Sequence, residues 1–471
     1  MKKFAKIAAA LAVVAISAMP AFAQRGSADF TTFVAIGDSY GAGYANNSLN
    51  ERHQVFSWPA IIAKQVGLRL CVPGDAAAAN CFAQPLVSYP GIGPEMVLTS
   101  LAPTIVTLPG SGAPLMPTFG RAYNNLSIPG ATVRDVNTIR GNEANPTRGP
   151  ERLAQFILRG LGTEVDQALS LHPTFIAVWI GGNDFLGAAT SGTPALLTSV
   201  DDFRTQYNAM LDRLVAGAPN AGMVVGNLPT TPNVPYLTTV PRVVVDLQRR
   251  PVLDPTGQPI PLIYDAGNGN IQPVPAGSFV LLHAQTKLQS GIGFPAFLRT
   301  VPPFSQLPNV GTPLADTDVL TPTELSAITA RVTEFNTIIQ QAASARSIPV
   351  ADIRGLFDRV AGGHLTIGPF AINPSYILGG FFSLDGVHPT DLGYILFANE
   401  FIRAINDAYD TEIPVASITQ LFANNGAFFG SDSHDLRANA TLSEEAASSL
   451  RSWWAGNNPA VSTQRFRAMR R

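Results

Sequence analysis

Short runs of apolar residues alternate with longer segments of mixed polarity along this chain of 471 residues. Continuous apolar runs are typical of parallel strands that are covered on both faces. Alternation of such strands with helical segments predicts a parallel α/β sheet with right-handed crossovers. We expect five strands: four in residues 33–36, 175–180, 223–225 and 348–351, and a short one within residues 123–131 that runs into a Pro-Gly turn.

Helices are predicted where apolar residues recur three or four positions apart. One is expected to begin at Ser57 and to stop near Gly67, and another lies in residues 200–214. The clearest signal is residues 321–324 (Thr-Pro-Thr-Glu), a capping box with proline at the first helical position. Its expected buried stripe consists of Leu325, Ile328, Val332, Phe335 and Ile339.

Residues 232–320 lose this regularity and are rich in proline. We interpret them as a long insertion that folds over the functional edge of the sheet, because an unstructured loop of this length is improbable in a compact domain. Asn268 and Gly269 predict a hairpin turn between two short strands. The apolar residues of this segment either line a pocket or pack into a small core of their own; they include Phe294, Phe297, Leu298 and Phe304.

The amino-terminal residues 1–23 have the features of a cleavable secretory signal. Three lysines precede an apolar stretch, and Ala21-Phe22-Ala23 is a small-x-small cleavage site. The apolar stretch is short for a membrane-spanning helix, which is the alternative interpretation. We therefore expect a secreted or periplasmic protein with no integral membrane segment after the signal is removed.

The remaining chain is expected to hold one main domain, in residues 24–410. Hydrophobic residues make up 46% of the chain and charged residues 14%, a composition typical of a globular protein with a sizeable core. The formal net charge is −2, and the basic residues cluster at the carboxyl terminus alone, which argues against nucleic acid as a partner. Residues 411–471 are expected to be an extension of unknown role, including a helix-like stretch in residues 442–454.

Cys71 and Cys81 are the two cysteines of the sequence. In an oxidising compartment we expect them to form a disulfide that closes the short loop between them. A metal site would need more ligands nearby, and a catalytic thiol would need a neighbouring histidine; the surrounding sequence offers neither. We expect no metal and no cofactor.

Three residues with candidate catalytic roles stand where the first three expected strands end. Ser39 stands in Gly-Asp-Ser-Tyr, Gly130 follows Pro129, and Asn183 lies in Gly-Gly-Asn-Asp. Open α/β sheets bind ligands at the carboxyl ends of their strands, so these residues are expected to share one edge. A serine hydroxyl can act as a nucleophile, and backbone or amide N–H groups can stabilise an oxyanion. Taken singly, each motif is also an ordinary turn or helix cap.

A base for the serine is available near the end of the main domain, in Asp385-Gly386-Val387-His388. Histidine is the natural base for a hydroxyl nucleophile, and a carboxylate fixes its tautomer and stabilises the imidazolium. Of the six histidines, His388 has the best local carboxylate. The alternative is that Asp385 and His388 merely cap the helix that follows.

With these four clusters in this order, the sequence resembles the SGNH/GDSL hydrolase family. The resemblance covers about residues 31–410, interrupted by residues 232–320, with Tyr40 where leucine is commoner. It implies a three-layer α/β/α sandwich with a mostly parallel, flavodoxin-like five-stranded sheet. It also implies ester or thioester hydrolysis without a metal, with Ser39 as nucleophile, His388 as general base and acid, and Asp385 as its orienter. The implied oxyanion hole consists of the backbone N–H groups of Ser39 and Gly130 and the amide of Asn183.

The sequence therefore predicts an exported serine esterase or lipase-like acyl hydrolase that acts on a small-molecule or lipid ester. Two alternatives stay open: a carbohydrate O-acetyl esterase, and a non-catalytic exported binding protein. The complete set of Ser39, Gly130, Asn183, Asp385 and His388 argues against the binding protein, because a relic has no reason to keep all five. The natural ester and the oligomeric state do not follow from the sequence.

Overall fold

A computed structural model describes residues 28–99, 104–230, 233–367, 370–417, 441–442 and 448. Its centre is a parallel sheet with the strand order β1 (Phe33–Gly37), β4 (Phe175–Trp179), β5 (Gly222–Gly226) and β10 (Val350–Ala351). Every residue of β1 and β4 is buried, as their continuous apolar runs predict. The predicted signal of residues 1–23 and most of the predicted extension lie outside the described residues.

The sheet has four hydrogen-bonded strands within the described residues, so the expected five-stranded sheet is corrected. The expected second strand runs beside the free edge of β1 but makes a single parallel bridge, between Ala35 and Asn125. The reason is local: the side chain of Asn124 donates to the carbonyl of Phe33 and accepts from the N–H of Ala83. Side-chain bonds thus replace part of the backbone ladder that a strand would form.

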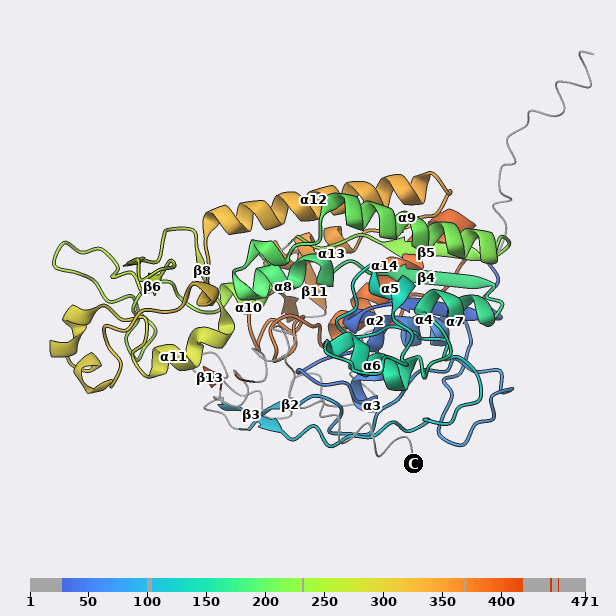
Figure 1. The fold of residues 1–471 in the computed structure, drawn as a ribbon, viewed down its shortest axis with the longest axis horizontal. Helices are drawn as coiled ribbons and strands as arrows, with labels where there is room; N and C mark the ends of the chain where they lie inside the picture. Colours follow the sequence, from blue (N-terminus) through green and yellow to red (C-terminus); the bar gives the residue numbers. More distant parts are fainter. Residues whose placement is uncertain are drawn as a thin grey trace, which may run out of the picture.

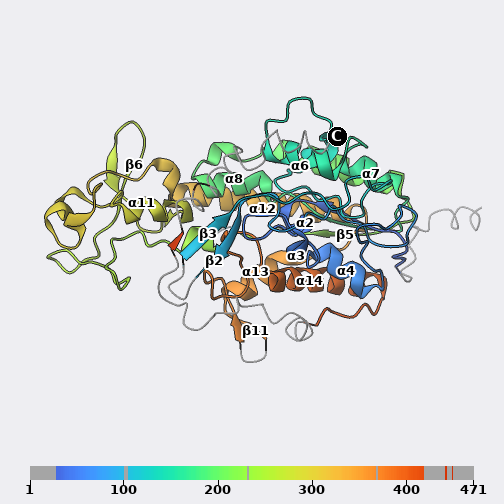
Figure 2. The same cartoon turned by 90° about the horizontal axis from the view of Figure 1, so that it is seen from below.

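Helices cover both faces of the sheet. One layer contains α4 (Trp58–Gln65), α13 (Ile353–Ala361) and α14 (Asp391–Tyr409); α14 contacts both other helices and the strands β5 and β10. The other contains α7 (Glu164–Ser170), α9 (Val200–Gly217) and α12 (Pro322–Ser344); α9 and α12 lie side by side (Figure 1). Figure 2 shows α4, α13 and α14 on one side of β5, and α7 with its neighbours on the other. The three-layer α/β/α arrangement is therefore present.

Local sequence signals explain where the longest helix begins. Thr321 caps α12 through the N–H of Glu324, and the carboxylate of Glu324 accepts from the N–H of Thr321 at 2.8 Å. This is the predicted capping box. Of the predicted apolar stripe, Leu325 is partly buried and the other four side chains are buried.

The remaining elements are short. The helices are α2 (Ser39–Ala42), α3 (Glu51–Gln54), α5 (Asp135–Thr138), α6 (Gly149–Ile157), α8 (Asn183–Ser191), α10 (Pro235–Thr238) and α11 (Gln285–Gln289). The strands are β2 (Glu95–Leu98), β3 (Thr104–Leu108), β6 (Ile263–Asp265), β7 (Ile271–Pro273), β8 (Phe279–Val280), β9 (Val319–Leu320), β11 (Leu365–Ile367), β12 (Phe370–Ile372) and β13 (Thr441–Leu442).

Residues 233–320, between β5 and α12, form a lobe that projects from one end of the layered body (Figure 1). The predicted hairpin is present: β6 and β7 pair antiparallel around Asn268 and Gly269, both of which have positive φ. Phe294 and Phe304 meet edge to face with centroids 5.5 Å apart. Phe294, Phe304 and Leu298 are buried and pack the interior of the lobe, whereas Phe297 is 59% exposed.

Cys71 and Cys81 form the predicted disulfide. It closes a surface loop in which Arg69 also pairs with Asp75 at 2.7 Å. Among the described residues, none of the helices is both long enough and apolar enough to span a bilayer.

Candidate active site

Ser39 is the first residue of α2, directly after the carboxyl end of β1. The side chain of Asp38 caps this helix by accepting from the N–H of Tyr40 at 3.0 Å, and the carbonyl of Ser39 accepts from the N–H of Tyr44 at 3.0 Å. The turn is tightly packed: a Cβ atom at Gly41 would lie 2.1 Å from Oγ of Ser127. Glycine at this position therefore lets the backbone of α2 lie close to Ser127.

Asn183, the first residue of α8, links the other two expected oxyanion donors. Its Nδ2 donates to the carbonyl of Ala131 at 2.9 Å and to Oδ2 of Asp38 at 3.3 Å. Ala131 follows Gly130, and Asp38 precedes Ser39, so one amide group bridges both segments. Gly130 has φ +85°, a conformation that side-chain-bearing residues rarely adopt.

Asp385 and His388 lie in the loop between β12 and α14, and both are buried. Nδ1 of His388 lies 3.0 Å from Oδ2 of Asp385. Oδ1 of Asp385 accepts from the backbone N–H groups of Val387 at 2.9 Å and His388 at 2.8 Å. Burial alone would raise the pKa of Asp385, but the charge and hydrogen bond of His388 and these N–H groups lower it below its usual value. Asp385 is thus held ionised against the imidazole.

The segment that follows α2 fixes this loop in place. Asn46 and Asn47 are consecutive residues with positive φ, a conformation that asparagine tolerates better than most residues. The N–H of Asn47 donates to Oδ2 of Asp385 at 3.0 Å, and Oδ1 of Asn46 accepts from the N–H of Leu384 at 3.0 Å. The serine segment and the histidine loop are therefore tied together by hydrogen bonds.

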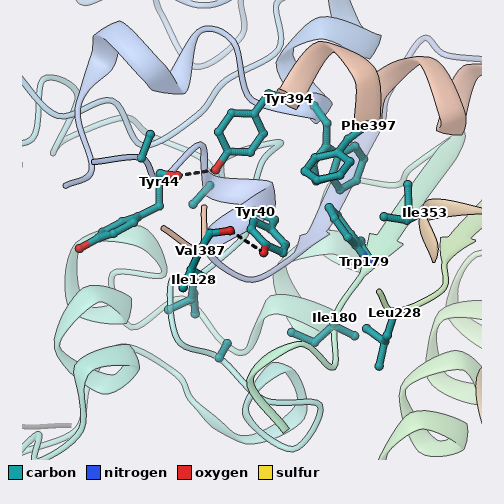
Figure 3. Close-up of a cluster of buried hydrophobic side chains, with 14 of the residues drawn as sticks. Tyr40, Tyr44, Ile128, Trp179, Ile180, Leu228, Ile353, Val387, Tyr394 and Phe397 are labelled. Atoms are coloured by element: carbon teal, nitrogen blue, oxygen red, sulfur yellow. Dashed lines mark hydrogen bonds between the residues drawn. The ribbon is translucent and has the colours of Figure 1, made fainter. Parts of the chain in front are cut away.

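Aromatic rings complete the contact between the two segments. The ring of His388 meets Tyr40 edge to face with centroids 5.5 Å apart, and it lies 4.8 Å from the ring of Tyr44. The hydroxyl of Tyr40 donates to the carbonyl of Val387 at 3.1 Å, and Tyr394 donates to the carbonyl of Tyr44 at 2.5 Å, as Figure 3 shows. Two tyrosines that follow Ser39 thus pack against the histidine.

Three buried carboxyl groups lie beneath this edge of the sheet. Burial raises the pKa of Asp38 to about 7, with a further contribution from the charge of Asp184. Burial likewise raises the pKa of Asp184 to about 7. Glu164 accepts from the N–H of Gly37 at 3.1 Å, and burial holds its pKa well above the usual value. At neutral pH Glu164 is therefore favoured in its protonated form, whereas Asp38 and Asp184 titrate close to neutrality.

In the structure the five sequence-predicted residues form two groups, which hydrogen bonds and ring contacts connect to each other. Ser39, Gly130 and Asn183 are linked through Asn183, and Asp385 and His388 are linked to the Ser39 segment through Asn47 and Tyr40. Sequence reasoning missed the supporting residues Asn46 and Asn47. Their signal is weak, because an Asn-Asn pair after a glycine-rich turn marks a left-handed bend but not what it contacts.

Residues 33–401 match the sequence profile of the family described as GDSL-like Lipase/Acylhydrolase. No curated protein sequence matches this chain. Solved structures that resemble it include an extracellular lipase from Streptomyces rimosus, which is 14% identical; the match covers 80% of this chain and 99% of the lipase, with a TM-score of 0.32. Another is an acetylxylan esterase from Geobacillus stearothermophilus, 13% identical over 84% of this chain and 99% of the esterase, with a TM-score of 0.33.

Proposed function

Because the chain belongs to the family of GDSL-like lipases and acylhydrolases, we propose that it hydrolyses carboxylic esters with Ser39 as its nucleophile. The observation that carries this proposal is the buried pair of His388 and Asp385, with Nδ1 and Oδ2 3.0 Å apart. The imidazole of this pair packs against Tyr40, the residue that follows Ser39. A base, its orienting carboxylate and a hydroxyl thus belong to one packed unit, as acyl transfer requires.

In the proposed reaction, the hydroxyl of Ser39 attacks the ester carbonyl while His388 accepts its proton. Asp385 keeps the proton of His388 on Nδ1, so that Nε2 is the nitrogen that acts as the base. His388 then returns the proton to the leaving alcohol, which leaves an acyl group on Ser39. Water, activated by His388 in the same way, releases the carboxylic acid and restores Ser39.

In this proposal, the N–H groups of Ser39 and Gly130 and the amide of Asn183 stabilise the negative charge of the tetrahedral intermediate by hydrogen bonds. The bond from Asn183 to Asp38 is 3.3 Å long, compared with 2.9 Å for its bond to Ala131. We expect the longer bond to be exchanged for the oxyanion, while the shorter one keeps the amide oriented. Each donor of this kind typically lowers the activation barrier by about 3 kcal/mol.

We also propose that the protein is exported. Residues 1–23 have the pattern of a cleavable signal, and the Cys71–Cys81 disulfide supports an oxidising compartment.

Replacement of the nucleophile tests the proposal. Ser39→Ala should lower kcat for p-nitrophenyl acetate by several orders of magnitude, because the oxyanion donors that remain have no attacking atom to assist. The matched control is Ser305→Ala, which changes an exposed serine of the lobe and should retain full activity. Circular dichroism and the melting temperature would show that both variants fold. Undiminished hydrolysis by a folded Ser39→Ala protein would overturn the proposal.

A further inference from the structure

An apolar pocket opens beside the proposed nucleophile. It lies between α8 on one side and residues 228–230 with Val234 and Leu237 on the other, and it is partly open to solvent. The residues that line it are Asp38, Tyr40, Trp179, Gly182, Phe185, Leu186, Ala189, Thr190, Leu228, Pro229, Thr230, Val234 and Leu237.

We infer that this pocket binds the acyl chain of the ester and selects for chains of medium length over acetyl groups. The inference rests on the proposed function. Aliphatic and aromatic side chains make up most of the lining. Its other side chains are the hydroxyl groups of Thr190 and Thr230 and the carboxyl group of Asp38. A sugar placed here would leave most of its hydroxyl groups without hydrogen-bond partners, which is costly in a desolvated site. A hydrocarbon chain meets no such cost.

The position of the pocket assigns it to the acyl side of the ester. Asp38 and Gly182 line it and directly precede Ser39 and Asn183, so the pocket lies next to the segments that carry the proposed nucleophile and one oxyanion donor. The leaving alcohol must instead reach His388 to receive its proton. Tyr40 separates the two places. Its ring stacks on Trp179, a wall of the pocket, at 5.0 Å, and its edge meets His388.

The base of the lobe supplies one wall. Val234 and Leu237 line the pocket, and the N–H of Tyr236 between them donates to the carbonyl of Gly386 at 2.9 Å. Gly386 belongs to the Asp385–His388 loop, so this wall is anchored directly to the proposed catalytic residues. The lobe therefore shapes the pocket through its first helix, α10, and not through the phenylalanines of its distal core.

The ratio of kcat/KM for a long ester to that for a short ester tests this inference. Burial of one CH₂ group strengthens binding about fourfold, so several methylene groups should raise kcat/KM substantially. We expect the wild-type protein to prefer p-nitrophenyl octanoate over p-nitrophenyl acetate by at least about tenfold in kcat/KM. Leu186 is half-buried at the pocket, and Leu186→Trp should lower the octanoate-to-acetate ratio at least about tenfold by filling it.

The matched control is Leu161→Trp, which places the same side chain at a leucine that is 57% exposed and outside the pocket. It should leave the ratio unchanged. Thr230→Trp fills the pocket from the opposite wall and serves if Leu186→Trp fails to fold, as judged by its melting temperature. A wild-type ratio near one, or equal losses on both esters in a folded pocket variant, would overturn the inference.

Failure of the proposed function would look different. If the protein hydrolyses neither ester, the proposed function is wrong. Binding of octanoate to the pocket can still be measured by calorimetric titration of Ser39→Ala with sodium octanoate. Saturable binding that Leu186→Trp weakens at least about tenfold, with acetate giving no heat, would support the pocket. Absence of octanoate binding to a folded Ser39→Ala protein would refute it.

Discussion

Two buried histidine–aspartate pairs in this protein have nearly the same geometry and very different surroundings. His388 and Asp385 are 3.0 Å apart at the edge of the sheet, and His283 and Asp318 are 2.9 Å apart at the base of the lobe. In the lobe, the hydroxyl of Tyr236 lies 2.7 Å from Nδ1 of His283, while Nε2 faces Asp318. Both ring nitrogens of His283 are therefore occupied by the protein itself, which leaves none to accept a proton from a substrate.

The two carboxylates also differ in what neutralises them. Asp318 accepts from Lys287 at 2.7 Å through both oxygens, whereas backbone N–H groups surround Asp385. In each case burial alone would raise the carboxyl pKa, and the partners lower it. A cation already balances Asp318, so its ionisation serves the fold. Asp385 instead faces His388, and a carboxylate in this position stabilises an imidazolium.

The largest effect should separate the two aspartates. Asp385→Asn is expected to lower kcat by about 10⁴-fold, since an amide no longer enforces the tautomer of His388. Asp318→Asn should leave kcat within a factor of two or three and lower the melting temperature instead, because Lys287 loses its buried partner. Steady-state kinetics and thermal unfolding of both variants check this. Comparable kinetic losses in the two would show that the pairs are not functionally distinct.

Variants of the residues that hydrogen-bond to each pair should show the same contrast between catalysis and stability, with smaller effects. Asn46→Ala removes the bond to the N–H of Leu384, and a loosened Asp385 loop should lower kcat by up to about 10²-fold with little change in KM. Tyr236→Phe removes the hydroxyl at His283 and should cost about 1 kcal/mol of unfolding free energy with kcat retained. Kinetics combined with urea unfolding measures both. A fall in kcat for Tyr236→Phe alone would reverse the assignment.

Carboxyl groups without a cationic partner should respond to pH in the opposite sense to Asp385. The native pKa of Asp184 is raised to about 7, so between about pH 4 and pH 7 the folded protein holds more protons than the unfolded chain. This group therefore lowers stability as the pH rises through that window. In Asp184→Asn, the excess of unfolding free energy at pH 5 over pH 8 should shrink by up to a few kcal/mol, at about 1.36 kcal/mol per pKa unit. An unchanged difference would contradict the raised pKa.

The smallest effect on catalysis is expected far from both pairs. The double variant Cys71→Ser and Cys81→Ser opens a loop of about ten residues and should cost on the order of 2–3 kcal/mol of unfolding free energy while kcat stays unchanged. Mass spectrometry without reduction should find the two thiols bonded in the wild-type protein. Free thiols in both positions, or a loss of activity in a folded variant, would contradict this.

Sequence patterns predicted the parts of the fold that local chemistry determines. The apolar run of β1, the capping box of Thr321 and Glu324, and the turn at Asn268 and Gly269 each carry their own signal. The prediction of a second strand was wrong because Asn124 makes side-chain hydrogen bonds that a hydrophobic pattern does not reveal. The pairing of β2 with β3 was also missed; it lies in a stretch rich in proline and glycine, where strand patterns are weak.

The site was predictable as a set of residue types and less so as an arrangement. Ser39, Gly130 and Asn183 follow the first three expected strands, which places them at one sheet edge. The sequence does not show that Asn183 bridges the other two segments, nor that the lobe reaches Gly386 through Tyr236. Both contacts join residues far apart in the chain, where spacing carries no information.

The most direct test of the central claim, that Ser39 is the nucleophile activated by His388, is to map the serine that a fluorophosphonate probe modifies. In the folded wild-type protein, peptide mass spectrometry should find the phosphonate on Ser39. The rate of modification should fall by at least about 10²-fold in His388→Ala, which removes the proposed base, and stay unchanged in His283→Ala. Modification of a different serine, or of Ser39 at an equal rate in His388→Ala, would contradict the account.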